Sequence, residues 1–67
     1  MKSIVDLKFG EVSKIKKVKG RFSDFFLNIG LTPNVRIKRI SMGDPSAYSF
    51  RGTVYAFRKD EAKGIGI

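Results

Sequence analysis

The sequence predicts a mainly β fold: a small five-stranded barrel with one amphipathic helix and one short helical turn, built as a single domain over residues 1–67. Large aromatic residues alternate with small or charged ones between residues 47 and 58, which is the spacing of a half-buried strand. Only one segment has clear helical spacing, and the remaining apolar runs are short. A set of short strands favours closure into a barrel, because closure removes exposed sheet edges.

The aromatic segment, residues 47–58, predicts a β-hairpin around which the other elements pack. A two-residue loop at Arg51 and Gly52 would place Phe50 opposite Thr53, and Gly52 tolerates the positive φ that a tight turn needs. Residues directly opposite each other share a face of the sheet. One face would then hold Tyr48, Phe50, Thr53, Tyr55 and Phe57, and the other Ser49, Arg51, Val54, Ala56 and Arg58.

The N-terminal part predicts a short apolar lead-in followed by the first strand. The lead-in is expected to pack under the barrel through Ile4, Val5, Leu7 and Phe9. In residues 11–19 the apolar positions are three apart, which fits a helix, but all three are β-branched: Val12, Ile15 and Val18. Glycines bracket this run. We therefore expect a strand with a bulge near Lys16 and Lys17 that returns Val18 to the inner face.

Residues 21–30 predict the amphipathic helix, placed between the first two strands. Its apolar residues fall at positions i, i+3, i+4 and i+7: Phe22, Phe25, Phe26 and Ile29. Gly30 supplies the left-handed residue after the helix, Leu31 can fold back on the last turn, and Pro33 prevents continuation. A single apolar stripe of this kind belongs to the core.

The C-terminal half predicts the remaining strands and a short helical turn. Residues 35–42 form a strand in which the apolar residues change parity, so a bulge or bend is expected between Lys38 and Arg39. Residues 43–46 form a turn, and residues 59–63 form a helical turn with Asp60 or Glu61 near its positive end. Residues 65–67 form the last strand. This order disfavours an oligonucleotide-binding barrel, whose helix comes later, and predicts an SH3-like barrel.

The residue types exclude most catalytic chemistry. The chain has no histidine and no cysteine, so it offers no nucleophile–imidazole pair, no thiolate and no ligands that transition metals prefer. The carboxylates are scattered, except for the adjacent pair Asp60 and Glu61, whose side chains diverge on a helical turn. No glycine-rich phosphate loop is present. We expect no enzymatic activity, no cofactor and no metal site.

Basic residues give the chain a formal net charge of +8, from 14 Lys and Arg against 6 Asp and Glu. Five of them fall within residues 14–21, and a neighbouring strand would bring Arg36, Lys38 and Arg39 beside them. The candidate docking patch is Lys14, Lys16, Lys17, Lys19, Arg21 and Lys38. Its alternative is a solvated outer face, since every second side chain of a strand meets water. Nucleic-acid barrels usually interleave exposed aromatics with the bases, and this run contains none.

The sequence favours a cytoplasmic location. The N-terminal residues contain no long apolar run, which argues against a secretory signal and against direct membrane insertion. The absence of cysteine is compatible with a reducing compartment. An exposed strand edge would allow weak homo-oligomers.

The chain resembles the FeoA-like family, small cytosolic proteins of bacterial ferrous iron uptake. Residues 26–33 (FLNIGLTP) are similar to the family's LGLTPG helix end. Residues 43–45, 48–53, 56–58 and Ala62 are similar to its DP…Y…RGT…ALR…A ending. The departures are Asn34 for a frequent Gly, Tyr55 for an aliphatic residue and Phe57 for Leu. Asn tolerates a left-handed turn, so the backbone is expected to be retained.

The resemblance implies an SH3-like barrel that acts through protein contact and carries no catalytic residues. Its implied partner is the ferrous iron permease, a membrane protein with a cytosolic GTPase domain, which would recruit the chain to the inner face of the membrane. Two alternatives remain: a basic barrel that binds nucleic acid, and a regulatory interaction module like that of metal-dependent repressors. The family's link to iron does not imply that this chain binds iron, because the sequence is poor in ligands.

Overall fold

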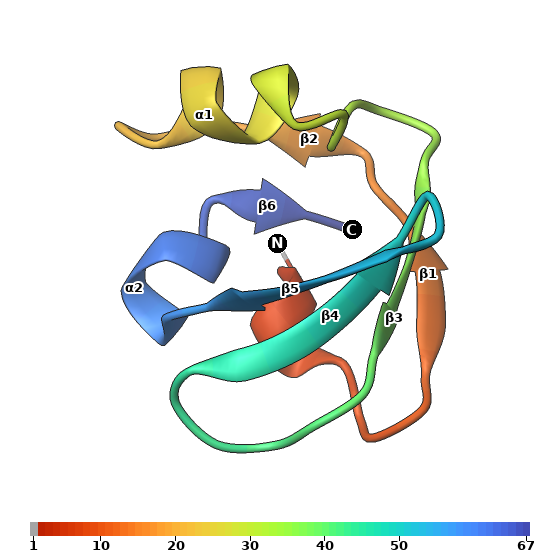
Figure 1. The fold of residues 1–67 in the computed structure, drawn as a ribbon. Helices are drawn as coiled ribbons and strands as arrows, with labels where there is room; N and C mark the ends of the chain where they lie inside the picture. The colour runs from red at the N-terminus through yellow and green to blue at the C-terminus, as the bar shows by residue number, and fades with distance from the viewer. Residues whose placement is uncertain (1) are drawn as a thin grey trace.

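The computed structural model describes residues 2–67, and the hairpin of β4 (Ser46–Phe50) and β5 (Thr53–Phe57) forms its longest strands (Figure 1). Arg51 and Gly52 form the two-residue loop, with φ values of 53° and 78°. Positive φ at both positions is the conformation of a type I′ turn, whose twist matches that of the paired strands. Phe50 pairs with Thr53 and Tyr48 with Tyr55, so the predicted register is confirmed.

The inner face of this hairpin supplies the aromatic core. Tyr48, Phe50 and Phe57 are buried and Tyr55 is half-buried, while Thr53 is exposed at the turn. The rings stack in series, with centroids 4.8 Å apart for Phe50 and Tyr55 and 5.9 Å for Tyr55 and Phe57. Aromatic pairs at these distances are worth about 0.5–1.5 kcal/mol beyond the area they bury.

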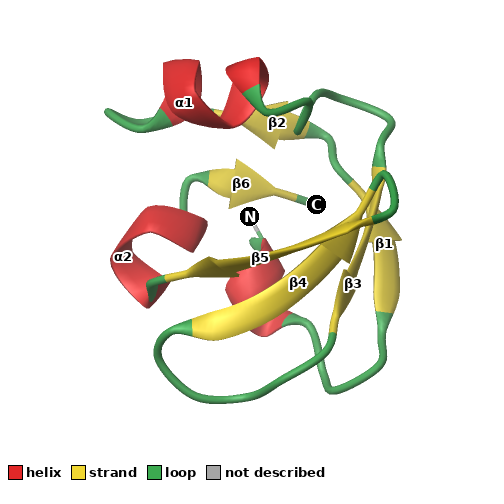
Figure 2. Ribbon diagram, viewed as in Figure 1, coloured by secondary structure: helices red, strands yellow, loops and turns green. Residues whose placement is uncertain are grey.

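The strands form two antiparallel sheets and no closed five-stranded barrel, which corrects the prediction (Figure 2). The first sheet has the order β1-β3-β4-β5, and the second pairs β2 with β6. The bounds of the four further strands are β1 (Val12–Lys14), β2 (Lys17–Val18), β3 (Arg36–Arg39) and β6 (Ile65–Gly66). The described part of the chain therefore has six strands, and the mainly β architecture is confirmed.

The sixth strand arises because residues 11–19, predicted as one strand, form two: β1 in the first sheet and β2 in the second. Val12 to Lys14 pair with β3, and the backbone of Ile15 then bonds with Val35 and Asn34. The N–H of Lys16 already donates to Gly66 O, 2.8 Å away, in the second sheet. The predicted bulge is thus a crossing from one sheet to the other, with Ile15 buried between them. Val12 points outward and is 51% exposed.

Gly64 allows the second sheet to approach the chain that leads into α1 (Ser23–Asn28). A Cβ atom built on Gly64 would lie 2.2 Å from the carbonyl oxygen of Lys19. The N–H of Lys19 donates to Gly64 O at 2.9 Å, so these two backbones are in direct contact. Only glycine fits such an approach without moving one of the two segments.

Helix α1 is shorter than the predicted segment 21–30 and lies between β2 and β3 instead of between the first two strands. A turn closed by the Ser23 N–H and Gly20 O precedes it. Gly30, whose φ is 92°, follows the helix and its C-cap Ile29, and the Leu31 N–H folds back to Phe26 O as expected. Phe26 is buried, but Phe25 of the predicted stripe is exposed, because only one side of this short helix meets the core.

Strand β3 corrects the predicted bend between Lys38 and Arg39. The register with β4 is continuous, pairing Lys38 with Ser49 and Arg39 with Tyr48, and the Ile40 N–H continues it by donating to Ala47 O. The inward residues are therefore Ile37 and Arg39, and Ile40 points outward. Because Ile40 and Met42 are apolar, a bend was expected to turn them inward, but the strand continues without one.

Two short helical segments complete the fold. The lead-in forms a 3₁₀ turn, η1 (Ile4–Asp6), capped by Ser3, with Ile4 and Leu7 buried. Phe9 of the lead-in was expected to pack under the barrel, but it is 72% exposed. The C-terminal helix is α2 (Lys59–Ala62), and Glu61 of its first turn accepts the Arg58 N–H at 2.8 Å. In the described part of the chain no helix is long and apolar enough to cross a membrane.

Candidate docking surface

The four-stranded sheet has one face that no other element of residues 2–67 covers. Helices α1 and α2, turn η1 and the β2–β6 sheet all lie on its inner side, where the buried residues point (Figures 1 and 2). We call the opposite side the outer sheet face. The strand registers assign nine residues to it: Val12, Lys14, Arg36, Lys38, Ile40, Ala47, Ser49, Val54 and Ala56.

The outer sheet face changes from apolar to basic along the strands. One row across the sheet consists of Ile40, Ala47 and Ala56, which are apolar. The next row runs Val12, Lys38, Ser49 and Val54, and the third pairs Lys14 with Arg36.

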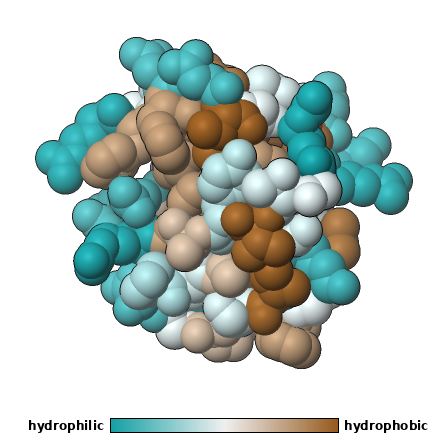
Figure 3. All heavy atoms as spheres, viewed as in Figure 1, coloured by the Kyte–Doolittle hydropathy of each residue, from teal (hydrophilic) through white to brown (hydrophobic). Residues whose placement is uncertain are grey.

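Two valines of the middle row meet solvent directly. Val54 is 60% exposed and Val12 51%. Figure 3 shows hydrophobic atoms reaching the surface in front of β4 and β5. A solvated face of an antiparallel sheet is normally polar, so exposed β-branched residues beside lysines are typical of a contact surface.

The structure brings together only part of the predicted patch. Lys14 and Lys38 lie diagonally opposite each other on the outer sheet face, together with Arg36. Lys17 lies on β2, opposite Gly66 in the second sheet. Lys16 lines a different, polar groove with residues of the N-terminal segment.

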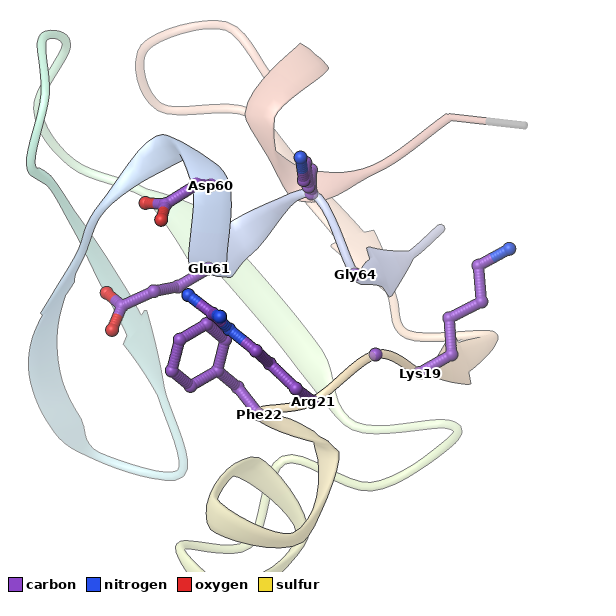
Figure 4. A pocket seen from close by; sticks show the side chains of 8 residues that line it. Lys19, Arg21, Phe22, Asp60, Glu61 and Gly64 are labelled. Atoms are coloured by element: carbon purple, nitrogen blue, oxygen red, sulfur yellow. The ribbon is translucent and has the colours of Figure 1, made fainter.

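Lys19 and Arg21 line a third region, a groove of about 300 Å³ beside α2 (Figure 4). Two carboxylates, Asp60 and Glu61, line it as well. The Arg21 side chain covers the ring of Phe22, with its guanidinium carbon 4.9 Å from the ring centroid. Charges of both signs therefore share this groove, so it is not a continuation of the basic sheet face.

Arg39 is basic but buried, with 6% of its surface exposed, and cannot contribute to a docking patch. Its guanidinium donates to four neutral oxygens: Val5 O at 2.6 Å, Leu7 O at 3.0 Å, Ser41 O at 3.1 Å and Ser46 Oγ at 2.6 Å. Its charge also lies 5.6 Å from the centroid of the Tyr48 ring. This arrangement fixes the lead-in to the sheet.

Arg39 and Tyr48 line one groove together with Asp44 and Lys59. Burial raises the pKa of Tyr48 above its ordinary value of 10.0, and the nearby Arg39 charge opposes this only in part. The tyrosine is therefore neutral at physiological pH. Among residues 2–67 the structure contains no cluster of three acidic or other ligating side chains that could hold a metal ion.

Sequence reasoning missed the apolar half of the outer sheet face. The hairpin pattern assigned Val54 and Ala56 to the side away from the aromatics, which was the available signal. The bend expected between Lys38 and Arg39 turned Ile40 inward, and no face was assigned to Val12, so the sequence did not indicate that both join Val54 on the outer sheet face. Only the pairing of β1 with β3, β3 with β4 and β4 with β5 shows that these residues share one face.

The comparisons with known proteins agree on one family. A model of the FeoA domain matches residues 2–67. The fold is similar to that of FeoA from Stenotrophomonas maltophilia complexed with zinc, described as a prokaryotic SH3 domain protein, with a TM-score of 0.92 at 15% identity over 97% of this chain and 87% of that one.

Two further solved structures share the fold. FeoA from Chlorobium tepidum has a TM-score of 0.86 at 23% identity, covering 96% of this chain and 66% of the other. An iron uptake regulatory protein, FeoA, has a TM-score of 0.84 at 20% identity, covering 92% and 88%. The search of curated protein sequences found no match. The fold is SH3-like, and since the family model spans all but the first residue, the chain belongs to the FeoA family.

Proposed function

We propose that this protein is a non-enzymatic accessory factor of ferrous iron uptake. It acts in the cytoplasm, at the inner face of the membrane, by docking on the cytosolic GTPase-bearing region of the iron permease. Membership of the FeoA family supports a role in ferrous iron uptake, and the S. maltophilia FeoA is itself described in terms of ferrous iron transport activation. The observation that carries the docking role is the uncovered outer sheet face, where Val12 and Val54 are exposed beside Lys14, Arg36 and Lys38.

This composition suits a protein contact. Exposed valines in the middle of the face provide apolar area to bury, at about 25 cal/mol per Å² before the costs of association. Lysine and arginine at one end provide long-range attraction to an acidic partner and raise the association rate.

The experiment is a calorimetric titration of the purified protein with the cytosolic region of the permease. In the variant K14E/K38E two charges of the outer sheet face are reversed, and we expect affinity to fall about tenfold or more. The matched control is K2E/K63E, whose two exposed lysines lie off this face. Each substitution changes the formal charge by −2, so both variants carry +4 in place of +8.

The two variants separate a local contact from a general charge effect. Equal loss of affinity in both would show that overall charge alone drives binding and would remove the outer sheet face from the proposal. Absence of binding by the unmodified protein would remove the permease as its partner.

A second candidate function, nucleic-acid binding, is favoured by one observation: Lys14, Arg36 and Lys38 lie on the same face of one sheet. Against it, the exposed aromatics Phe9 and Phe25 lie off this face, so no base-stacking platform accompanies the charges. Binding to single- or double-stranded probes that weakens steeply with salt would support this role. No binding at low salt would exclude it.

A further inference from the structure

The free edge of β5 is the feature that points beyond the proposed function. In the order β1-β3-β4-β5 this strand ends the sheet, and β4 alone lies alongside it (Figure 1). The two-residue loop fixes which of its backbone groups bond to β4. Pairs 50–53, 48–55 and 46–57 exchange hydrogen bonds, so the N–H and C=O groups of Val54 and Ala56 point away from β4.

These outward backbone groups are unpaired within residues 2–67. No hydrogen bond joins the N–H or C=O of Val54 or Ala56 to another group of the described chain. The side chains of Thr53, Val54 and Ala56 are exposed, which leaves the edge open to solvent. The edge therefore offers a row of two donors and two acceptors.

The β5 edge also lacks the usual protection against pairing. Native edge strands are commonly very short, or carry lysine, proline or a bulge that prevents another strand from adding. Strand β5 is five residues long, contains no charged residue, proline or glycine, and pairs with β4 without a bulge. The opposite edge, β1, is only three residues long and includes Lys14.

The charges around this edge indicate which strand would add. Arg51 and Arg58 are exposed at its two ends, and residues 46–59 contain no Asp or Glu. In an antiparallel pair of two copies, Arg51 of one would lie near Arg58 of the other, and each chain carries +8. This repulsion disfavours a second copy and favours an acidic strand.

We propose that β5 accepts an extended acidic segment of its partner as a fifth strand of the sheet. The main-chain hydrogen bonds at Val54 and Ala56 would supply affinity, and Arg51 and Arg58 would select for acidic residues, which is the mode known as β-augmentation. This rests on the proposed function for the partner's identity, the cytosolic region of the permease. It adds the site, the geometry and the chemistry of the bound segment.

The test removes the outward donors one at a time. Val54→Pro and Ala56→Pro each delete an N–H that makes no hydrogen bond within residues 2–67, and proline is tolerated at edge strands. The matched control Val54→Thr retains the N–H and the β-branched shape. We expect Val54→Pro to bind the permease region about tenfold or more weakly than Val54→Thr, and Ala56→Pro about tenfold or more weakly than the unmodified protein, because a backbone acceptor of the partner is left unpaired. Circular dichroism and thermal melting verify that each variant is folded.

Amide hydrogen exchange by NMR gives an independent result. We expect binding of the permease region to protect the Val54 and Ala56 amides selectively. Full affinity in both proline variants, with these amides unprotected, would overturn the inference and leave the proposed function intact. Concentration-dependent dimers that Val54→Pro abolishes would overturn the acidic occupant in favour of a second copy.

A peptide probe keeps the two proposals separable if the permease region does not bind. A capped peptide of alternating glutamate and valine should shift and protect the Val54 and Ala56 amides, and one of alternating lysine and valine should not. That result would support the β5 edge after the permease had been excluded. Equal or absent effects of the two peptides would overturn it.

Discussion

Arg39 joins three parts of the chain that lie far apart in the sequence. Its guanidinium donates to the lead-in at Val5 and Leu7, to its own strand end at Ser41 and to the start of β4 at Ser46. Ser46 in turn donates through Oγ to Gly43 O, so the loop before β4 belongs to the same network. A buried cation that is matched only by neutral oxygens has a structural role, because it satisfies carbonyls that would otherwise lack donors.

Replacing Arg39 with methionine should therefore destabilise the protein strongly. The change keeps a long side chain but leaves three carbonyls and one hydroxyl without their donor, and each unsatisfied buried group costs about 1–3 kcal/mol. We expect the free energy of unfolding, measured with urea, to fall by about 3 kcal/mol or more. The matched control Arg36→Met, two residues along the same strand but exposed, should stay within about 0.5 kcal/mol. An equal decrease in the two variants would show that the hydrogen bonds of Arg39 do not contribute to the free energy of unfolding.

At the scale of elements, the hairpin was predictable and the other strands were less so. Alternating aromatics and the Arg51–Gly52 loop specify a register through neighbouring residues alone, and the register is correct. The division of residues 11–19 between two sheets depends on Val35 and Gly66, which are remote in sequence. The inward position of Arg39 depends on carbonyls of the lead-in. Its charge indicated a place among the solvent-facing basic residues, and that prediction is wrong.

The candidate docking surface was also predictable only in part. The sequence identified the basic residues but could not group them, since grouping requires the pairing of β1 with β3. Lys14 and Lys38 share the outer sheet face, whereas Lys19 and Arg21 lie beside the carboxylates of α2.

The hairpin loop contains a residue that is not optimal for its conformation. Arg51 has φ 53°, a left-handed geometry that costs a non-glycine residue about 1–2 kcal/mol and that Asn tolerates better. Its side chain lies against Gly30, which offsets part of this cost. We expect Arg51→Asn to raise the free energy of unfolding by about 0.5 kcal/mol, measured by thermal and urea denaturation. A decrease would show that the contact with Gly30 outweighs the backbone strain.

At the scale of the whole molecule, the net charge opposes folding into so small a volume. The Cα atoms extend over 25 × 22 × 21 Å, and the chain carries a formal +8. The Debye length is about 30 Å at 0.01 M salt and about 8 Å at 0.15 M. At low salt every charge thus acts on every other across the molecule, whereas near physiological salt only neighbouring charges interact.

Salt should therefore stabilise this protein, and we expect its melting temperature to rise as NaCl increases from about 0.01 M to about 0.15 M. The increase should be smaller in K14E/K38E, whose formal charge is +4, because less repulsion remains to be screened. Differential scanning calorimetry of both proteins at matched pH measures this difference. The same increase in both would assign the effect to ion binding or to hydration. A larger response in the unmodified protein would show that the charge which attracts an acidic partner also lowers the stability of the free protein, so that partner binding would relieve the repulsion.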